Sequence, residues 1–367
     1  MDHSIALERP LAEARVASGT RTRERIADDM AMLRTAAELT RELNAPKPAI
    51  YWGDMLLSAT VGYAALAGAM LLASPVFALV SGIVAILALY RAGSFIHEIT
   101  HIKHSAVPGF RLGWNLLIGI PLMVPSFLYE GVHNLHHART RYGTAEDPEY
   151  LPLALMKPWT LPLFVVVSLL APVALLVRFS VLAPLSLLFP KLRAQVVGKY
   201  SGLQINPAFA RRAPEGKARM LWHRLEAATS IWSIGLLTLT ATGFIPLRAL
   251  LIFLAVAAGV TLINQIRTLV AHLWENEGEA MTVTAQYLDT VNVPPPALLP
   301  VLWAPVGLRY HALHHLLPGL PYHALAEAHR RLGKALSPES PYHKASYAGL
   351  PGLVGRIARS TMGGAVR

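Results

Sequence analysis

Runs of apolar residues long enough to cross a lipid bilayer recur along this chain. Residues 55–72 and 76–90 form one pair, joined by an uncharged turn at residues 73–75. Residues 227–247 and 249–266 form a second pair with a similarly short connection. About 20 apolar residues in a helix cross the ~30 Å hydrocarbon layer. The pattern therefore predicts an all-α, multi-pass membrane protein with about four transmembrane helices, arranged as two hairpins.

Two further apolar segments are interrupted, and we expect them to behave differently. Residues 161–190 contain Pro172, Arg178 and Pro184, and residues 116–128 contain two prolines. A single crossing by 161–190 would place the polar segments on its two sides on opposite faces of the membrane. We therefore expect re-entrant or interfacial helices here, where proline and arginine are tolerated near the headgroups.

Composition supports the membrane class and limits the possible chemistry. Hydrophobic residues make up 53% of the 367 residues and charged residues only 15%, which is typical of integral membrane proteins. The chain has no cysteine, so a metal ion would be held by nitrogen and oxygen ligands. The formal net charge is +11, but no basic groove with interleaved aromatic residues is visible. We therefore expect contact with anionic lipid and no nucleic-acid binding.

The distribution of basic residues predicts an orientation. Arg91, Lys103 and Arg111 follow the first hairpin, and seven lysines and arginines lie within residues 191–219, ahead of the second. The positive-inside rule then places the N-terminus, the C-terminus and the polar segments in the cytoplasm. We expect no removable signal peptide. The predicted regions are cytoplasmic N-terminal interfacial helices in residues 1–50, a membrane domain in residues 51–330 and a cytoplasmic C-terminal tail in residues 331–367.

Nine of the fifteen histidines follow the predicted hairpins in short clusters. Three clusters read HEITH, HNLHH and HALHH, and one more histidine ends the stretch RTLVAH. Positions i, i+3 and i+4 share one face of a helix, so the imidazoles of a cluster can point at one ion. Neutral imidazole is the commonest metal ligand, and one ion takes at most about six donors, so nine convergent imidazoles imply two ions. The candidate metal ligands are His97, His101, His133, His136, His137, His272, His311, His314 and His315.

The remaining histidines are not expected to bind the metal. His3 and His223 are predicted to be solvated. His104 lies seven residues after His97, on the same helical face, and we expect it to support the ligands. Three further histidines lie in the polar C-terminal region, at His323, His329 and His343.

The three histidine boxes resemble those of the membrane fatty acid desaturase superfamily, whose members are non-haem di-iron enzymes. The resemblance is strongest over residues 93–137 and 272–322, where the segment HALHHLLPGLPYH includes the proline-containing tail of the third box. It implies a four-helix stalk, a cytoplasmic helical cap and two iron ions held by the nine histidines, with His272 matching the extra histidine after the fourth helix. Family members often have an asparagine four residues before that histidine, and it contacts a metal through water. Here that position is Thr268, and Asn264 lies one turn earlier.

The resemblance also implies an activity. Superfamily members use iron and O2 to oxidise acyl chains, so we expect O2-dependent desaturation of the acyl chain of a lipid or acyl thioester. A hydroxylase or ketolase of a lipid or carotenoid on the same scaffold is the alternative. Because the chain shows no nucleotide fingerprint and no haem-binding domain, we expect electrons from a separate ferredoxin-like or cytochrome b5-like donor.

Two other classes of protein deserve comparison. HEITH matches the HExxH zinc-protease motif, in which Glu98 would be the general base. Three protein ligands around one zinc would leave both HxxHH copies without a role, so we expect Glu98 instead to accept a hydrogen bond from a ligand imidazole. A histidine-rich metal transporter would need ionisable residues inside its spans, and the predicted spans contain almost none.

Four residues near the second box are further candidates. Asp147 or Glu146, in the polar turn YGTAEDPEY, could orient a ligand imidazole, although a solvated turn fits the sequence equally well. Trp114 and Asn115 could line an acyl channel, whereas aromatic residues near a membrane interface usually serve as anchors.

Overall fold

The computed structural model describes residues 26–364. Within this range every regular element is helical, and β-pairing is limited to isolated bridges, such as the one between His272 and Thr290. The predicted all-α class is therefore confirmed. The first half of the expected N-terminal region, including His3, lies outside the described residues.

The first predicted hairpin consists of helices α3 (Pro48–Leu71) and α4 (Pro75–His101). A proline begins each helix, where its missing N–H would have no helical partner. A Cβ added at Gly62 would lie 2.6 Å from Leu89 Cδ2, so glycine allows the two helices to approach closely. Because α4 continues beyond its apolar part to His101, it carries the first histidine box on its last turns.

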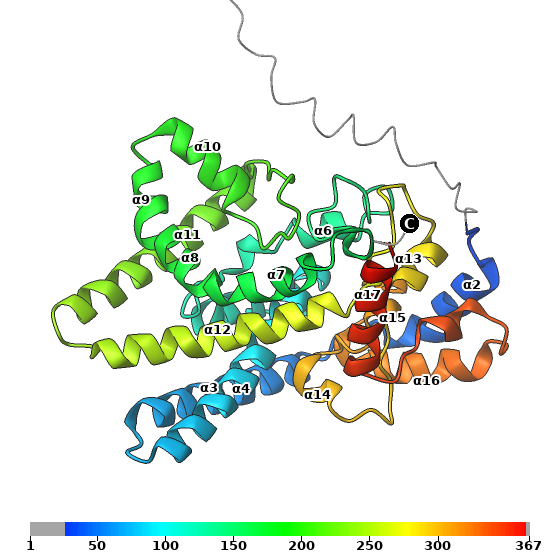
Figure 1. Cartoon of the computed structure of the whole chain (residues 1–367), viewed down its shortest axis with the longest axis horizontal. Helices are drawn as coiled ribbons and strands as arrows, with labels where there is room; N and C mark the ends of the chain where they lie inside the picture. Colours follow the sequence, from blue (N-terminus) through cyan, green and yellow to red (C-terminus); the bar gives the residue numbers. More distant parts are fainter. Residues whose placement is uncertain (1–25, 365–367) are drawn as a thin grey trace, which may run out of the picture.

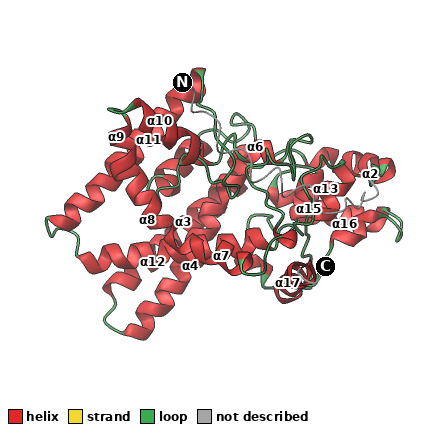
Figure 2. Cartoon of the chain, turned by 45° about the horizontal axis from the view of Figure 1, so that its top comes forward, coloured by secondary structure: helices red, strands yellow, loops and turns green. Residues whose placement is uncertain are grey.

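The second hairpin consists of α11 (Gly216–Ala241) and α12 (Leu247–Leu269). It lies beside the first, and both hairpins project from the same side of the molecule (Figure 1; Figure 2). α12 packs against α4, where a Cβ on Gly259 would meet Ile86 Cδ1 at 2.5 Å. The chain is therefore a multi-pass membrane protein built on two adjacent hairpins.

The structure changes the assignment of one predicted span. By length and composition, four helical stretches within residues 26–364 could cross a membrane. α11 is long enough but is too polar to be among them, because it begins with the sequence GKARMLWHRLE. The four stretches are Pro48–Leu71, Pro75–His101, Thr160–Ser186 and Leu247–Leu269.

The stretch Thr160–Ser186 is not one regular helix. It contains α7 (Thr160–Val166), α8 (Ala171–Val177) and α9 (Ala183–Ser186), separated by a 3-10 turn and a π turn. Arg178, in the π turn, donates to Glu226 in the first half of α11 at 2.6 Å, and Arg193 donates to the other oxygen of Glu226 at 2.7 Å. Because Arg178 and Arg193 contact the same residue of α11, the chain reverses direction between them. Arg178 is buried in this ion pair, whereas the sequence suggested a position near the headgroups; the path through the membrane stays a prediction.

The other regular elements are short. The remaining α-helices are α2 (Met30–Thr40), α5 (Phe110–Trp114), α6 (His133–His136), α10 (Pro190–Lys199), α13 (Val283–Asp289), α14 (Pro300–Trp303), α15 (His311–Leu316), α16 (Leu325–Ala335) and α17 (Leu350–Gly364). The 3-10 and π segments are Arg41–Leu43, Asn115–Gly119, Ser126–Leu128, Leu153–Leu155, Val167–Leu170, Arg178–Leu182, Tyr322–Ala324 and Pro341–Ala345.

A helical cap forms at the end of the molecule opposite the hairpin tips (Figure 1). It gathers α2, α13, α15, α16 and α17, and its core joins Met32 of α2 to Leu332 of α16. The expected boundary after residue 330 falls inside α16, and α17 buries Leu353 and Ile357 against the body of the protein. The last described residues are therefore part of the cap and not a separate tail.

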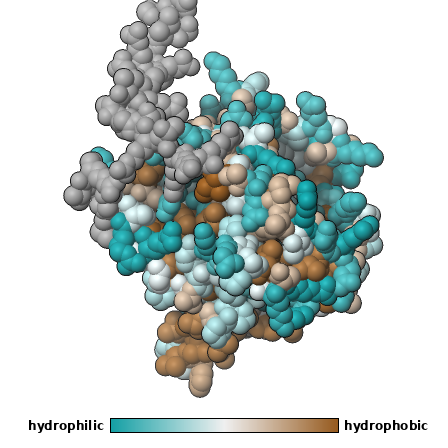
Figure 3. Space-filling view, turned by 90° about the vertical axis from the view of Figure 1, so that its right-hand side faces the viewer, coloured by the Kyte–Doolittle hydropathy of each residue, from teal (hydrophilic) through white to brown (hydrophobic). Residues whose placement is uncertain are grey.

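The molecular surface separates into apolar and polar parts. In Figure 3, hydrophobic atoms gather at the bottom, where the α3–α4 hairpin projects, and hydrophilic atoms surround the cap. Leu71 and Phe77, near the hairpin tip, are 82% and 66% exposed. Apolar side chains exposed together in this way indicate contact with lipid.

Candidate metal centre

All nine predicted histidines meet where α4 and α12 end. They form two groups, and within each group the candidate ligand atoms lie within 4.8 Å of one another. Three boxes that are far apart along the chain therefore converge at one place. The first group contains His97, His101, His133, His137 and His314, and the second contains His136, His272, His311 and His315.

The two HxxHH boxes divide their histidines between the groups in opposite ways. In the second box, at α6, His133 and His137 enter the first group and His136 enters the second. In the third box, on α15, the residues spaced i and i+4 enter the second group, and His314 enters the first. Each short helical segment thus presents imidazoles to both groups, which holds the two groups side by side.

The ring nitrogens converge on shared points. His137 Nε2 lies 3.0 Å from His133 Nε2 and 3.1 Å from His314 Nε2. His311 Nε2 lies 3.1 Å from the Nε2 atoms of both His272 and His315. Nitrogen lone pairs arranged in this way are typical of metal ligands.

Burial gives these imidazoles the protonation state that metal binding requires. Because they are removed from water and lie beside one another, their pKa values fall well below the ordinary value. This holds for His133, His137, His272, His311, His314 and His315. In addition, both ring nitrogens of His97 and Nε2 of His101 are buried without a hydrogen-bond partner among the described residues. Neutral, buried, unpaired nitrogens fit a metal ion.

Carboxylates contact the Nδ1 atoms of two of the imidazoles. Asp147 accepts from His136 Nδ1 at 2.9 Å and is held by the N–H groups of Gly143 and Glu149. Burial alone would lower the pKa of His136, but the adjacent Asp147 carboxylate raises it. Glu149 Oε1 lies 2.9 Å from His133 Nδ1, and Tyr129 donates to Glu149 Oε2 at 3.0 Å. Such contacts fix the ring orientation and leave Nε2 free to bind a metal.

A phenol links a third imidazole to a buried acid. Tyr142 donates to Asp289 Oδ2 at 2.8 Å, and its oxygen lies 2.9 Å from His272 Nδ1. Burial raises the pKa of Tyr142 well above its usual value and raises that of Asp289 to about 7. The phenol therefore keeps its proton for Asp289 and accepts the hydrogen bond from His272.

The sequence predicted only some of the residues that hydrogen-bond to the ligand imidazoles. Asp147 lies where a ligand-orienting residue was expected, whereas Glu146 is exposed and pairs with Arg141 at 3.6 Å. Tyr142 and Glu149 stand in the same YGTAEDPEY turn, so that polar stretch was the available signal for them. Asp289, at the end of α13, had no comparable signal.

Glu98 occupies a different environment from the one predicted. Its Oε2 accepts from the Tyr51 hydroxyl at 2.6 Å and from the Tyr322 N–H at 3.1 Å. Its Oε1 lies 3.7 Å from His97 Nδ1, beyond hydrogen-bond distance. Glu98 therefore joins α3, α4 and the tail of the third box, instead of accepting a hydrogen bond from a ligand.

The other candidates lie apart from the histidine groups. His104 is partly exposed, 3.5 Å from Glu130. Thr268 donates to the backbone oxygen of Asn264, and the Asn264 amide oxygen lies 3.5 Å from Arg267 Nη2, so both engage partners within α12. None of these contacts involves one of the nine imidazoles, so a supporting role for His104, Thr268 or Asn264 stays a prediction.

Trp114 and Asn115 are also structural in their contacts. Trp114 Nε1 donates to the Ala92 carbonyl at 2.8 Å, and the Asn115 amide bonds Ser126 from both of its ends. Both side chains are buried and hydrogen-bonded, and a role in lining an acyl channel stays a prediction. Among the other histidines, His323 accepts from the N–H of Lys47.

Four apolar stretches and two adjacent histidine groups define a multi-pass membrane protein with a candidate binuclear metal site. The sequence pattern of the fatty acid desaturase family matches residues 71–348, so this chain belongs to the fatty acid desaturase family. The chain is also similar to the ceramide hydroxylase of Caulobacter vibrioides (strain NA1000 / CB15N). The two are 48% identical over 333 residues, which cover 91% of this chain and 95% of that relative.

Proposed function

We propose that this protein is an O2-dependent hydroxylase of a ceramide-type lipid, with two iron ions held by the nine histidines. The observation on which this rests most directly is the pair of adjacent imidazole groups, with five and four possible ligands. Similarity to a ceramide hydroxylase supports hydroxylation over the desaturation that the sequence first suggested. A carotenoid substrate has no such support.

The donor set suits this chemistry. When bound, an iron pair would supply, with O2, the oxidising power toward an unactivated C–H bond that redox-inert zinc lacks. His97, His101, His133, His137 and His314 would hold one ion, and His136, His272, His311 and His315 the other.

The chain's own residues prepare the site for its ligands. Asp147 and Glu149 hold the Nδ1 protons of His136 and His133, and Tyr142 does the same for His272. With the proton fixed on Nδ1, each Nε2 lone pair points into the centre. The site is thus preorganised, because burial keeps the rings of His133 and His272 neutral and the acceptors fix the orientation of all three rings.

The zinc-protease reading is poorly supported by the geometry. A general base must reach the water that it activates, but Oε2 of Glu98 is occupied by Tyr51 and by the Tyr322 N–H. Nine converging imidazoles also exceed the three ligands of such a zinc site.

Metal analysis and lipid mass spectrometry test the proposal together. Purified protein should contain about two irons per chain, and a lipid from expressing cells should gain the mass of one oxygen atom. A His315→Ala variant should lose both properties, whereas His223→Ala, an exposed histidine on α11, should keep them. Loss of two hydrogens from the lipid would instead indicate desaturation, and an unchanged lipidome would contradict the assignment.

A further inference from the structure

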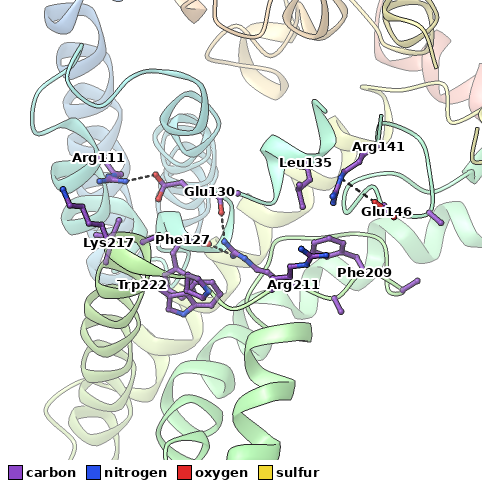
Figure 4. Close-up of a pocket in the computed structure, with 18 residues that line it drawn as sticks. Arg111, Phe127, Glu130, Leu135, Arg141, Glu146, Phe209, Arg211, Lys217 and Trp222 are labelled. Atoms are coloured by element: carbon purple, nitrogen blue, oxygen red, sulfur yellow. Dashed lines mark hydrogen bonds and ion pairs between the residues drawn. The ribbon is translucent and has the colours of Figure 1, made fainter. Parts of the chain in front are cut away.

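A basic pocket opens on the surface beside the second histidine box. Its volume is about 860 Å³, and its walls come from the loops around residues 141–146 and 208–214 and from the start of α11 (Figure 4). The cations that line it are Arg111, Arg141, Arg211, Arg212 and Lys217, against two carboxylates, Glu130 and Glu146.

Part of this positive charge is not neutralised within the protein. Arg111 pairs with Glu130 at 3.2 Å, and Arg141 pairs with Glu146. By contrast, Arg212 and Lys217 have no carboxylate within ion-pair distance among residues 26–364. A pocket with surplus positive charge attracts an anionic surface over long range.

Arg211 is held in place in the wall of the pocket. Arg211 donates to the backbone carbonyls of Phe127, Ser201 and Glu130, and its guanidinium stacks 4.5 Å from the Trp222 ring. The Arg211 guanidinium is thus ordered before any partner arrives, which lowers the entropic cost of binding to it.

The floor of the pocket lies next to the candidate metal centre. Leu135, which lines it, stands between His133 and His136 in the second box. The neighbouring loop has two sides. Arg141 and Glu146 face the pocket, whereas Tyr142 and Asp147 contact the imidazoles of His272 and His136.

Hydrogen bonds also tie this loop to the segment that precedes the pocket wall. Asn206, in the segment that leads to the pocket wall, donates to the backbone oxygen of Asp147 at 2.9 Å, and the Asp147 carboxylate bonds His136. A redox group held over this pocket would therefore lie beside a loop whose other side contacts the ligand imidazoles.

We propose that this pocket docks the acidic surface of a soluble one-electron carrier protein. The inference rests on the proposed hydroxylase function. Hydroxylation of one C–H bond consumes one O2, two electrons and two protons; one oxygen atom enters the new C–OH group and the other leaves as water. Two reduced carriers, each oxidised by one electron in turn at this pocket, supply the electrons, and water supplies the protons.

Proximity to the centre favours a carrier over an anionic lipid headgroup. A headgroup site needs only charge at the membrane interface, and the cations of residues 191–199 on α10 already offer that. Electron delivery requires a short separation from the metals, and the pocket meets this requirement at Leu135 and at the loop 141–147.

Charge reversal at the two unpaired cations tests the proposal. We compare Arg212→Glu and Lys217→Glu with Lys334→Glu, which makes the same charge change at an exposed position of α16, in the cap and outside the pocket lining. The probe is an acidic [2Fe–2S] ferredoxin with its reductase, and the proteins are reconstituted in nanodiscs. We expect the KM for ferredoxin to rise about tenfold or more. The single-turnover rate, measured by anaerobic reduction with dithionite, removal of its excess and addition of O2, should be unchanged.

A binding measurement provides a readout independent of turnover. Surface plasmon resonance should show ferredoxin binding that weakens steeply with salt for the wild-type protein and Lys334→Glu. Binding should be largely lost for the two pocket variants. Unchanged ferredoxin binding in those variants would overturn the proposal, as would an equal loss of rate with ferredoxin and dithionite.

Two further outcomes separate this proposal from its alternatives. If the pocket variants lose binding of phosphatidylglycerol in nanodiscs but keep ferredoxin binding, the pocket is a lipid site and the docking proposal is wrong. If the wild-type protein makes no hydroxylated lipid with dithionite, the proposed function has failed, whereas ferredoxin binding still reports on the pocket.

Discussion

At the scale of single residues, the sequence identifies the nine candidate metal ligands but only some of the residues that hydrogen-bond to them. The nine histidines follow a helical spacing that identifies them without a structure. Asp289 lies 17 residues from His272 and reaches it only through Tyr142, itself 130 residues away from that histidine. Contacts across such distances depend on tertiary packing, so no local pattern predicts them.

Asp147→Asn tests the importance of the residues that hydrogen-bond to the ligand imidazoles. The carboxylate accepts the Nδ1 proton of His136, and an amide can present its NH2 group there instead and favour the wrong tautomer. We expect iron affinity to fall by about 10–100-fold, measured by competition with a chelator and by metal analysis. Glu146→Gln, an exposed neighbour, is the control. Equal affinity in Asp147→Asn and wild type would show that His136 needs no carboxylate.

A histidine away from the metal centre should make the cap sensitive to acid. Burial, with nearby cations, lowers the pKa of His329 from 6.5 to about 4, and the ring bonds the Tyr342 hydroxyl at 2.8 Å. Between these pH values the unfolded chain binds a proton that the folded protein does not, so stability falls as pH falls from 6.5 toward 4. His329→Gln should weaken this dependence, as followed by thermal unfolding at several pH values. His223→Gln should behave like wild type; the same pH slope in both variants would exclude His329 as the cause.

At the scale of elements, one buried carboxylate connects three segments. Glu98 of α4 accepts from Tyr51 of α3 and from the backbone of Tyr322, directly after the third box. The Tyr322 hydroxyl then donates to Asp54 of α3 at 3.0 Å. These bonds fix the third box relative to the first, which explains a glutamate inside the HEITH motif without a catalytic role.

Glu98→Gln separates the structural role from a catalytic one. The amide oxygen can still accept from Tyr51 and Tyr322, so we expect lipid hydroxylation to stay within a few-fold of wild type. A general base would lose about 100-fold or more on this change. Glu98→Leu should destabilise the fold by about 1–3 kcal/mol for each donor left unpaired, seen as a lower unfolding temperature. A large loss of activity in Glu98→Gln at wild-type stability would restore the catalytic reading.

The elements also show where hydropathy succeeds and where it fails. The runs at 55–72, 76–90 and 249–266 became long helices, because uninterrupted apolar residues specify a lipid-facing surface directly. Hydropathy did not predict the structure of residues 161–190 in the same way. Its broken helices are held by Arg178 and Arg193 on Glu226, an ion pair that joins distant parts of the chain.

At the scale of the whole molecule, convergence of the histidines restricts the topology. His137 precedes the stretch Thr160–Ser186 and both helices of the second hairpin, whereas His272 follows them, yet the two lie in adjacent groups. An even number of crossings must therefore separate them. The two candidate spans between them, Thr160–Ser186 and α12, satisfy this condition if each crosses once. The pair α11 and α12 satisfies it instead if Thr160–Ser186 enters and leaves on one side.

The sidedness of this arrangement can be measured because the chain has no cysteine. Seven basic residues lie within 191–219, before the second hairpin, so we expect the cap in the cytoplasm and the hairpin tips on the far side. We would introduce Thr242→Cys at the exposed α11–α12 turn and Lys334→Cys on the exposed face of α16. A membrane-impermeant maleimide applied to spheroplasts should label Thr242→Cys at once and Lys334→Cys only after permeabilisation, with the cysteine-free chain as background. The reverse pattern would place the histidines outside the cytoplasm, where soluble cytoplasmic carriers cannot reach them.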